Sequence, residues 1–207
     1  MSLFLNLPLR HKSILLIATI CCSVIVGCGT SVEAPSEFEK WTDNDNAFTI
    51  DFPSDWTADG GGKNGVKWAE FTKGSAIIKL DFDVTSSLIG DIASGGAGAL
   101  NFDAGKNFSE VEKIRMAPIH KAHEMNKLRT SDQFRNYSEG EPLPYKCGLG
   151  DSRKSEFKAS SMTGSIRGYR STSLTLNNGV LINCSCKEGD WEKLKPAFSR
   201  VLESLGR

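Results

Sequence analysis

Two histidines in the second half of the chain have a spacing that metal sites use. His120 and His123 would lie one turn apart on the same side of a helix, with Glu124 beside them. Zinc needs a third protein ligand, and the H-E-x-x-H pattern of zinc proteases is absent from the sequence. We therefore expect no metal or other cofactor, with His120 and His123 as the candidates if a metal binds. We expect both imidazoles on a solvated helix face.

A serine in "GLGDSR" (residues 148–153) is the nearest approach to a catalytic nucleophile. The block resembles the Gly-Asp-Ser block of GDS-type esterases, which complete their site with an Asp-x-x-His near the C-terminal end. No histidine follows His123 in this chain, so that arrangement cannot be completed here. Since a serine nucleophile needs a base to take its proton, we predict no catalytic residue.

The first 27 residues have the composition of a secretory signal. They contain no Asp or Glu, and a basic patch at residues 10–12 precedes an uncharged run from Ser13 to Val26. That run of about 14 residues would make roughly 21 Å of helix. It is shorter than the ~20 residues that cross a bilayer but suits the apolar region of a signal peptide. The alternatives are a retained transmembrane anchor and a buried apolar helix.

The uncharged run leads into Ile25-Val26-Gly27-Cys28, which resembles the lipobox of bacterial lipoproteins. The resemblance implies that residues 1–27 are a signal peptide, that the Cys28 thiol takes a diacylglyceryl group, and that the new N-terminus is acylated, for example with palmitate. In such lipoproteins of bacteria with two membranes, a residue other than Asp after the cysteine favours export to the outer membrane. Gly29 stands there, so the resemblance implies an outer-membrane lipoprotein that faces the periplasm.

Charge argues against two kinds of partner. Removing residues 1–27 takes away Arg10 and Lys12 but no acidic residue, which leaves 23 basic and 25 acidic residues and a net charge of −2. A general nucleic-acid binder would show a basic stripe, so we expect no nucleic-acid partner. The lipid alone must then hold the chain at the membrane, and two or more acyl chains do so stably at ~0.8 kcal/mol for each buried CH₂.

Three cysteines remain once Cys28 is lipidated, an odd number in an oxidising compartment: Cys147, Cys184 and Cys186. A bridge between Cys184 and Cys186, two apart on one strand, would be strained. A bridge from Cys147 to either would close a loop of roughly 37 residues, for which loop-closure entropy predicts on the order of 3–4 kcal/mol of stabilisation. Buried free thiols and a reactive or metal-binding C-x-C pair are the alternatives.

Residues 28–40 are polar and predict the lipidated N-terminus and a tether, which leaves residues 41–207 as one α+β domain. Alternating apolar residues predict a strand over 48–52, and a hairpin over 65–86 that turns at Lys73-Gly74. The stretch "DGGGKNG" between these strands is rich in residues that tolerate positive φ, and we expect an exposed loop there.

A helix is predicted to follow a capping box that runs from Ser109 to Glu112. Ile119, Ala122 and Met125 keep roughly helical spacing on its apolar side, and Pro118 must kink or restart it. Residues 130–155 are polar, with two prolines and several glycines, and predict a long surface excursion.

The last third of the chain predicts a short strand, a long hairpin and a helix. If Asn178-Gly179 is a two-residue type I′ turn, Ser173 pairs with Cys184. Side chains of the last strand that share one face are Val180, Ile182, Cys184 and Cys186. The stretch "DWEKLKPAFSRVLESL" predicts an amphipathic helix. Its inward residues would be Trp191, Leu194, Phe198, Val201, Leu202 and Leu205.

Strands, a helix, strands and a final helix, with hairpins and no regular βαβ alternation, predict an α+β sandwich on a mainly antiparallel sheet. The stretches "FTIDFPSDW" (48–56) and "WEKLKPAFSRVLESL" (191–205) resemble the PsbP-like group. That group includes the extrinsic photosystem II subunit, a Ran-binding nuclear import factor and many small bacterial lipoproteins. The resemblance implies an α-β-α sandwich that binds or helps to assemble partners without catalysing a reaction.

Two functions remain open. The first is a lipid-anchored envelope lipoprotein that acts as a non-catalytic binding or assembly module for a protein partner or small ligand. The alternative is an envelope hydrolase with an unidentified active site. An enzyme needs a concave site where titratable groups converge, for example His120 beside Ser152 or a pair of carboxylates in a deep pocket.

Overall fold

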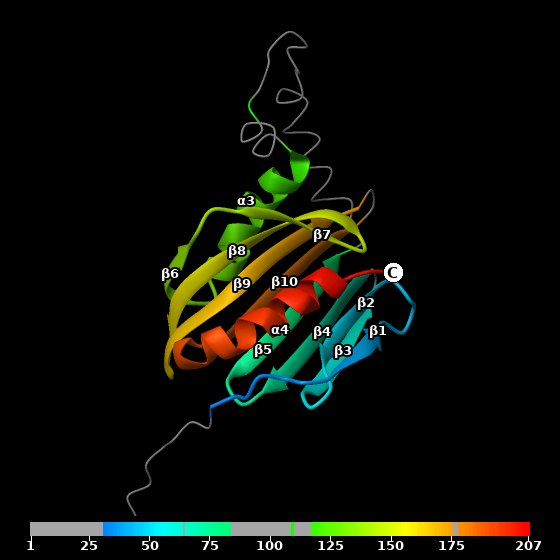
Figure 1. The fold of residues 1–207 in the computed structure, drawn as a ribbon. Coiled ribbons are helices and arrows are strands. Elements are labelled where there is room, and N and C mark those ends of the chain that lie inside the picture. The colour runs from blue at the N-terminus through cyan, green and yellow to red at the C-terminus, as the bar shows by residue number, and fades with distance from the viewer. Residues whose placement is uncertain (1–30, 64, 84–108, 110–116, 176–177) are drawn as a thin grey trace, which may run out of the picture.

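Antiparallel strands form the centre of the molecule (Figure 1). The computed structural model describes residues 31–63, 65–83, 109, 117–175 and 178–207. The large sheet has eight strands, in the order β3-β4-β5-β10-β9-β8-β6, with β7 also paired to β8. Its strands are β3 (Thr57–Lys63), β4 (Val66–Lys73), β5 (Ala76–Asp83), β6 (Arg135–Glu139), β7 (Leu143–Cys147), β8 (Gly150–Ser161), β9 (Gly164–Leu174) and β10 (Gly179–Lys187). A second sheet pairs β1 (Phe38–Thr42) with β2 (Thr49–Pro53).

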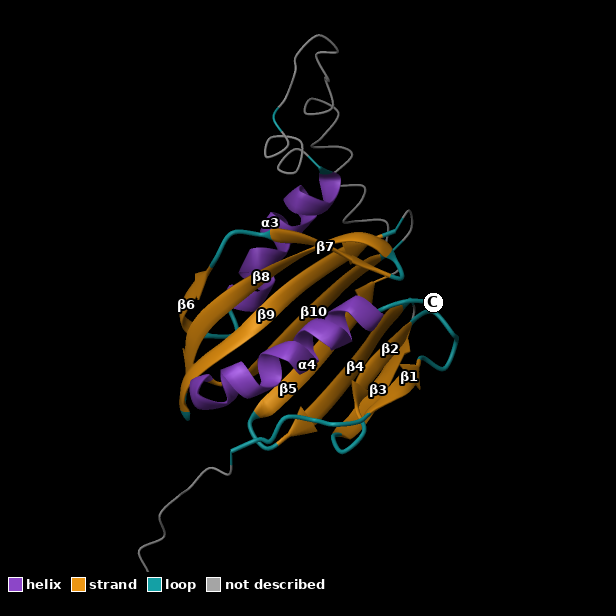
Figure 2. Cartoon of the chain, in the orientation of Figure 1, coloured by secondary structure: helices purple, strands orange, loops and turns teal. Residues whose placement is uncertain are grey.

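In the part of the chain that the structure describes, each face of the large sheet carries one α-helix (Figure 2). α4 (Trp191–Ser204) follows the short 3-10 helix η1 (Glu188–Asp190), and α3 (Pro118–Ser131) lies on the other side. Tyr169 and Thr172 of β9 are three residues apart and so point to opposite faces. Tyr169 packs against Trp191 of α4, and Thr172 bonds to His123 of α3. The predicted α+β fold, an α-β-α sandwich on an antiparallel sheet, is confirmed.

α4 is held by an apolar core, as its sequence pattern predicts. All six residues expected on its inner side are buried: Trp191, Leu194, Phe198, Val201, Leu202 and Leu205. The Trp191 ring lies 5.0 Å from that of Tyr169 and 6.2 Å from that of Phe198, measured between centroids. Burying a large apolar side chain contributes about 1.5–3 kcal/mol, so this helix is firmly fixed.

The β9–β10 hairpin has a different register from the one expected. Gly179 pairs with Leu174 and Val180 with Ser173, so Cys184 lies opposite Tyr169 and not opposite Ser173. The connection is therefore longer than the two residues expected, and the Thr175 N–H donates to the carbonyl oxygen of Asn178. A shift of four residues is even, so each side chain stays on its predicted face. The shared face of the four β10 residues is accordingly confirmed.

The glycine-rich stretch expected as a loop is strand β3, paired with β4. The glycines within β3, Gly60 to Gly62, are not turn residues, whereas Gly65, between β3 and β4, has the positive φ (83°) that was expected. A Cβ on Gly60 would lie 2.6 Å from the Trp41 ring, and one on Gly62 would lie 2.5 Å from the Val66 carbonyl oxygen. Small residues are needed where another group approaches the backbone this closely, which composition alone does not reveal.

Residues 130–155 do not form the surface excursion expected from their polarity. They hold the end of α3, the strands β6 and β7, and the start of β8. β6 and β7 are largely exposed, which explains their polar composition. Pro144 is tolerated in β7 because that strand pairs with β8 alone among the described strands.

α3 begins at Pro118, which stands in its first turn, where a missing N–H costs no helical hydrogen bond. The structure thus has a helix beginning at this proline, and whether Pro118 kinks or restarts an earlier helix stays a prediction. Residues 110–116, with most of the expected capping box, lie outside the described residues. Ile119 and Ala122 are buried as predicted, but Met125 is exposed.

The folded part begins earlier than residue 41, where the tether was expected to end. β1 starts at Phe38, and Val32 is buried against the α4 core. The expected signal peptide and Cys28 lie outside the described residues. Among the described helices, none is long and apolar enough to cross a membrane.

Candidate functional site

α3 buries three polar side chains together with two apolar ones and leaves two large apolar side chains exposed. Its buried residues are Ile119, Ala122, His123, Asn126 and Thr130. Met125 and Leu128, by contrast, are 48% and 70% exposed. An ordinary surface helix buries its apolar stripe, so the outer face of α3, defined by Met125 and Leu128, is unusual.

The His123 side chain is hydrogen-bonded to two strands of the large sheet. Its Nδ1 lies 3.0 Å from the Thr172 hydroxyl oxygen on β9, and its Nε2 lies 2.9 Å from the Ser155 hydroxyl oxygen on β8. Both ring nitrogens are thus engaged, as a neutral imidazole with one donor and one acceptor allows. The prediction of a solvated helix face is wrong for this histidine. Hydroxyl partners on the sheet offset the free-energy cost of burying its polar ring.

A buried ion pair continues the same cluster. The Arg170 Nε donates to Glu139 Oε1 at 2.7 Å, and their side chains are 0% and 2% exposed. Arg170 also donates to the carbonyl oxygen of His123, and Lys127 lies 4.0 Å from Glu139 Oε2. We call His123, Ser155, Thr172, Arg170 and Glu139 the α3 network. It ties α3 to β6, β8 and β9.

The α3 network does not have the chemistry of a serine hydrolase. The Glu139 carboxylate lies 3.8 Å from Nε2 of His123, the same nitrogen that bonds Ser155, whereas a triad carboxylate bonds the other nitrogen. Burial, and after it the Arg170 charge, lowers the pKa of His123 to about 2. A histidine that does not take up a proton near neutral pH cannot act as the general base. The network is therefore a positioning device for α3.

The same contacts bear on the two metal candidates. Both nitrogens of His123 are used by hydroxyl groups, so this residue cannot join His120 as a ligand without breaking the α3 network. Within the described ranges, no group of three histidine, cysteine or acidic residues is placed to hold a metal ion.

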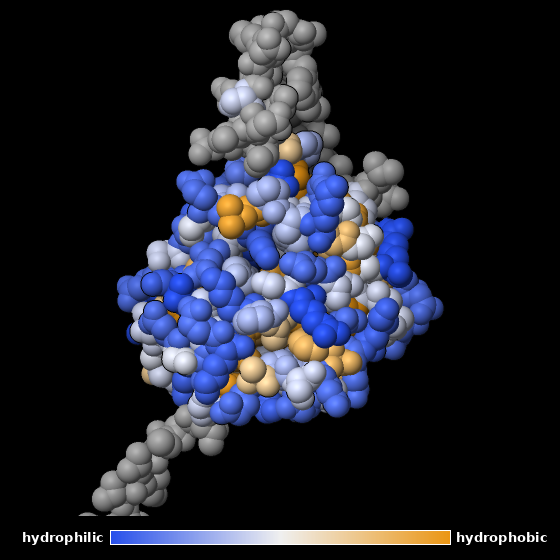
Figure 3. Space-filling view, in the orientation of Figure 1, coloured by the Kyte–Doolittle hydropathy of each residue, from blue (hydrophilic) through white to orange (hydrophobic). Residues whose placement is uncertain are grey.

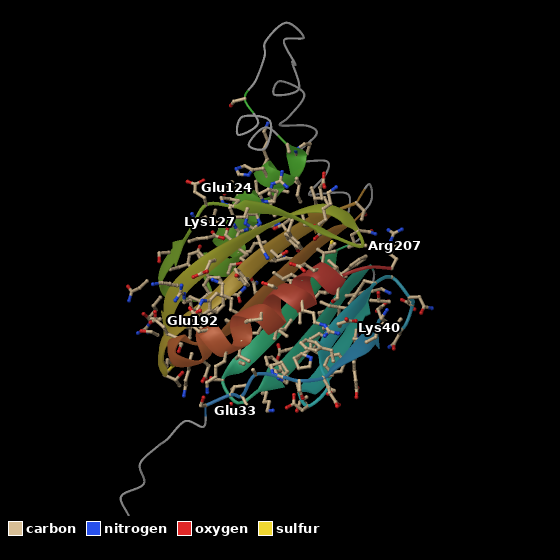
Figure 4. The ribbon with its side chains drawn as sticks, viewed as in Figure 1. Glu33, Lys40, Glu124, Lys127, Glu192 and Arg207 are labelled. Carbon is tan, nitrogen blue, oxygen red and sulfur yellow. The ribbon has the colours of Figure 1, made fainter. Side chains whose placement is uncertain are left out.

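A pocket of about 380 Å³ lies between α3 and the loop that links β6 to β7. Its lining residues are His120, Glu124, Lys127, Glu139, Gly140, Glu141 and Pro142. Figure 4 shows Glu124 and Lys127 at this end of the molecule. Glu139, at its inner side, is already paired with Arg170. We call this cavity the α3 pocket, and its walls are polar and charged.

A second pocket, of about 440 Å³, lies at the strand ends where the β4–β5 turn and the β8–β9 turn meet. It is lined by Gly74, Ser75, Phe134, Ser161, Thr163, Ile166, Ser185 and Lys187. Hydroxyl groups dominate its walls, with two apolar side chains and one cation. On the face drawn in Figure 3, most side chains are hydrophilic and the apolar ones form small separate groups.

Ser152 of the "GLGDSR" block lies on the α4 face of the sheet. Its hydroxyl oxygen is 2.7 Å from that of Ser173 and 3.3 Å from the Cys147 sulfur, and it is buried. α3 carries His120 on the other face, so the structure does not bring His120 to Ser152. Among the described residues, His123 contacts Ser155, at 2.9 Å between Nε2 and the hydroxyl oxygen, and this serine was not among the predicted site residues.

The structure corrects the expected Cys147 bridges. Cys147, Cys184 and Cys186 are free thiols, the last two buried beneath α4. Cys147 is on β7, which β8 and β9 separate from β10. Three strand spacings amount to on the order of 14 Å, well beyond the ~7 Å limit between bridged Cα atoms. The alternative of buried thiols describes Cys184 and Cys186.

Most residues of the α3 network were not predicted as site residues from the sequence. Arg170 and Thr172 alternate along β9 with Tyr169 and Ser171, so both faces of this strand contain polar residues. A strand that is polar on both faces looks solvated in the sequence. The available signal was the pairing of such a strand with a helix whose buried spacing is also polar, as at His123, Asn126 and Thr130.

No protein-family model matches the chain. No curated protein matches it by sequence either. Among solved structures, the solution structure of cyanobacterial PsbP (CyanoP) from Synechocystis sp. PCC 6803 is similar, with a TM-score of 0.51 at 11% identity, covering 86% of this chain and 94% of that one.

Two further structures align less well. The Ran-binding protein Mog1p of Saccharomyces cerevisiae gives a TM-score of 0.47 at 5% identity, with 82% of this chain and 94% of that chain covered. LpqN of Mycobacterium tuberculosis, involved in cell envelope biogenesis, gives 0.37 at 9% identity, with 86% and 88% covered. The CyanoP likeness alone supports the fold. It agrees with the resemblance seen in the sequence: this chain has the PsbP-like fold.

Proposed function

We propose that the protein is a lipid-anchored envelope lipoprotein that acts as a non-catalytic binding or assembly module. Its binding surface is the outer face of α3, and its ligand is a protein partner. The observation that carries this proposal is the exposure of Met125 and Leu128 on α3, while the polar residues His123, Asn126 and Thr130 of the same helix are buried.

A partner that covers α3 would gain free energy by burying the exposed apolar side chains of this helix. Leu128 is 70% exposed, and fully burying such a side chain contributes about 1.5–3 kcal/mol. Protein interfaces typically combine an apolar centre with a polar rim. Around Leu128 that rim is supplied by Lys121 and Glu124, seven and four residues before it on the helix, and by the adjoining Lys127.

The α3 network supports binding by fixing the helix in advance. A surface that is already ordered loses less conformational entropy when a partner docks. His123 bonds strands β8 and β9, and Arg170 bonds the backbone of α3. The polar interior of α3 therefore positions its outer face.

The anchor is proposed from the sequence at Cys28. The lipobox at residues 25–28 supports a diacylglyceryl group there, and the periplasmic side of the outer membrane is the proposed location. Two or more acyl chains give stable attachment.

Two measurements test this function. A Cys28→Ser variant should lose incorporation of labelled palmitate and should leave the detergent phase. With the anchor intact, co-purification from detergent-solubilised membranes should recover a partner with the wild type, and a Leu128→Ser variant should lose it. A control Val66→Ser change, at another exposed apolar residue, on β4 (47% exposed), should retain the partner.

Retention of the partner by Leu128→Ser would remove α3 from the proposal. If no partner is recovered and the pure protein instead hydrolyses an ester or peptide library, the envelope hydrolase takes its place.

A further inference from the structure

The first described residues are fixed to the start of α4. The Ser31 hydroxyl donates to Asp190 Oδ1 at 2.6 Å and accepts from Lys193 Nζ at 2.9 Å. Lys193 also lies 3.5 Å from Glu33 Oε1. These contacts join residues more than 150 positions apart in the chain, which a freely moving tether would not make.

Val32 makes the attachment apolar as well as polar. Its side chain is only 3% exposed and belongs to the core cluster beneath α4. We call Ser31, Val32 and Glu33 the N-terminal clasp. Figure 4 places Glu33 at the edge of the molecule nearest the start of α4, at the opposite end from Glu124 and Lys127.

The clasp shortens the reach of a lipid on Cys28. Residues span at most about 3.3–3.6 Å each, so three residues from Cys28 to Ser31 reach about 11 Å. Without the clasp, the first fixed residue would be Phe38 at the start of β1, and ten residues reach about 35 Å. An anchor held within about 11 Å of Ser31 leaves the domain little freedom to turn over on a membrane.

The clasp lies at one end of the large sheet, beside two other segments. These are η1, next to the clasp through Asp190, and the β8–β9 turn, whose Met162 is 98% exposed. Lys158 near the end of β8 lies 3.9 Å from Glu188 of η1, which joins the two segments. We call η1 and the β8–β9 turn the clasp edge.

The chemistry of the clasp edge fits a lipid surface held by an anchor. Its charged residues are acidic, and neighbouring cations pair with them and with the clasp, as in Lys158–Glu188 and Lys193–Glu33, so charge gives no net attraction to anionic lipid. Met162, at the tip of a tight hairpin, is an apolar side chain with nothing to cover it among the described residues. Proximity supplied by the anchor, together with this apolar tip, directs the edge to the membrane.

We propose that the N-terminal clasp holds the clasp edge against the membrane, with Met162 in contact with lipid and the outer face of α3 turned away from it. This inference rests on the proposed lipidation of Cys28. It gives the tether a function in orientation: the partner surface of α3 projects into the periplasm.

Depth-dependent quenching in vesicles tests this orientation. Full-length lipidated protein in a Cys147→Ser background would carry a fluorophore at Met162→Cys or, as the distal control, at Leu128→Cys. Vesicles of phosphatidylethanolamine and phosphatidylglycerol would contain a nitroxide-labelled lipid. We expect severalfold stronger quenching at position 162 than at position 128.

A clasp variant separates orientation from attachment. Ser31→Ala with Val32→Ser should remain bound to vesicles but lose most of the difference between the two positions, while Lys40→Ala on β1 should keep it. A urea unfolding midpoint close to that of the wild type checks that the clasp variant is folded.

The two proposals fail in different ways. Bound protein with equal quenching at 162 and 128, or an unchanged difference in the folded clasp variant, overturns the clasp alone. Wild-type protein that stays in the aqueous phase, as Cys28→Ser should, overturns the anchor and the orientation that depends on it.

Discussion

The Nε2 atom of His123 lies 2.9 Å from the hydroxyl oxygen of Ser155, and the two residues are 0% and 1% exposed. A histidine and a serine at this distance invite a catalytic interpretation. The other ring nitrogen, however, bonds Thr172, and no substrate carbonyl can approach a serine so deeply buried. The pair attaches α3 to the sheet and thereby positions the outer face of that helix.

Acid should destabilise the protein through His123. Its folded pKa is about 2, lowered by burial and then by Arg170, against 6.5 for an unperturbed histidine. Below pH 6.5, His123 binds a proton in the unfolded chain but not in the folded chain. The free energy of unfolding should then fall by about 1.4 kcal/mol per pH unit from this residue, between pH 6 and the folded pKa. Arg153 and Lys127 add positive charge in the same direction.

Urea unfolding of the wild type and a His123→Gln variant, measured from pH 7.5 to 4.5, isolates this contribution. The amide can still bond Ser155 and Thr172 but does not titrate. The difference in unfolding free energy between the two proteins should shrink or reverse as pH falls. Parallel pH dependence in the two proteins contradicts a neutral buried His123.

The Arg170–Glu139 pair should be costly to break. Glu139→Gln removes one partner and leaves the other charge buried, so we expect a loss of about 3–5 kcal/mol in unfolding free energy. Replacing both residues by Met and Leu should cost less than the single change, because no buried charge is then left unpaired.

The exposed Lys73–Asp55 pair provides the matched control, with side chains 36% and 52% exposed. Lys73→Ala should change the unfolding free energy by less than about 1 kcal/mol. Equal effects of Lys73→Ala and Glu139→Gln would contradict the burial of the α3 network.

Gly168 of β9 should not tolerate a side chain. A Cβ there would lie 2.2 Å from the Cys184 carbonyl oxygen and 2.6 Å from Cζ of Phe157. Because one of these neighbours is backbone of the paired strand, Gly168→Ala should cost at least about 1–3 kcal/mol.

Gly189→Ala is the control, because nothing lies within 4 Å of the added Cβ. It should stay within about 0.5 kcal/mol of the wild type by thermal or urea unfolding. A Gly168→Ala protein as stable as Gly189→Ala would place β9 and β10 further apart than described.

The three thiols should be free and unequal in reactivity. Burial raises the pKa of Cys184 well above its usual range, and burial followed by the Asp190 charge raises the pKa of Cys186 to about 12. Neither is a thiolate at neutral pH, whereas Cys147 is only half-buried.

In the proposed mature protein, which has lost residues 1–27 and carries lipid on the Cys28 thiol, a thiol reagent should therefore modify Cys147 first. Cys184 and Cys186 should react only after unfolding, and three thiols should then be counted without any reductant. A count of one thiol under these conditions would show that a disulfide forms after all.

The sequence predicted the elements whose patterns are regular. The inner residues of α4 follow a period of 3.6, and those of β10 a period of two, and both faces are as expected. The register of the β9–β10 hairpin could not be predicted, because Asn178-Gly179 favours a two-residue turn that tertiary packing replaces with a longer one.

The candidate site was the least predictable part. A buried Arg170 or His123 is stable only because Glu139, Ser155 and Thr172 come to it from other strands, and such partners are not local in sequence. Met125 was expected inside because its spacing suits an apolar stripe. The polar interior of α3 overrides that pattern and leaves Met125 outside.

Site-specific photo-cross-linking in intact cells tests the central claim most directly. A photoreactive amino acid would replace Leu128 on α3 or, as the control, Val66 on β4, which are 70% and 47% exposed. With Cys28 unchanged, we predict a discrete protein adduct from position 128 and none from position 66. The absence of an adduct at 128, or the same adducts at both positions, would contradict the assignment of α3 as the binding surface.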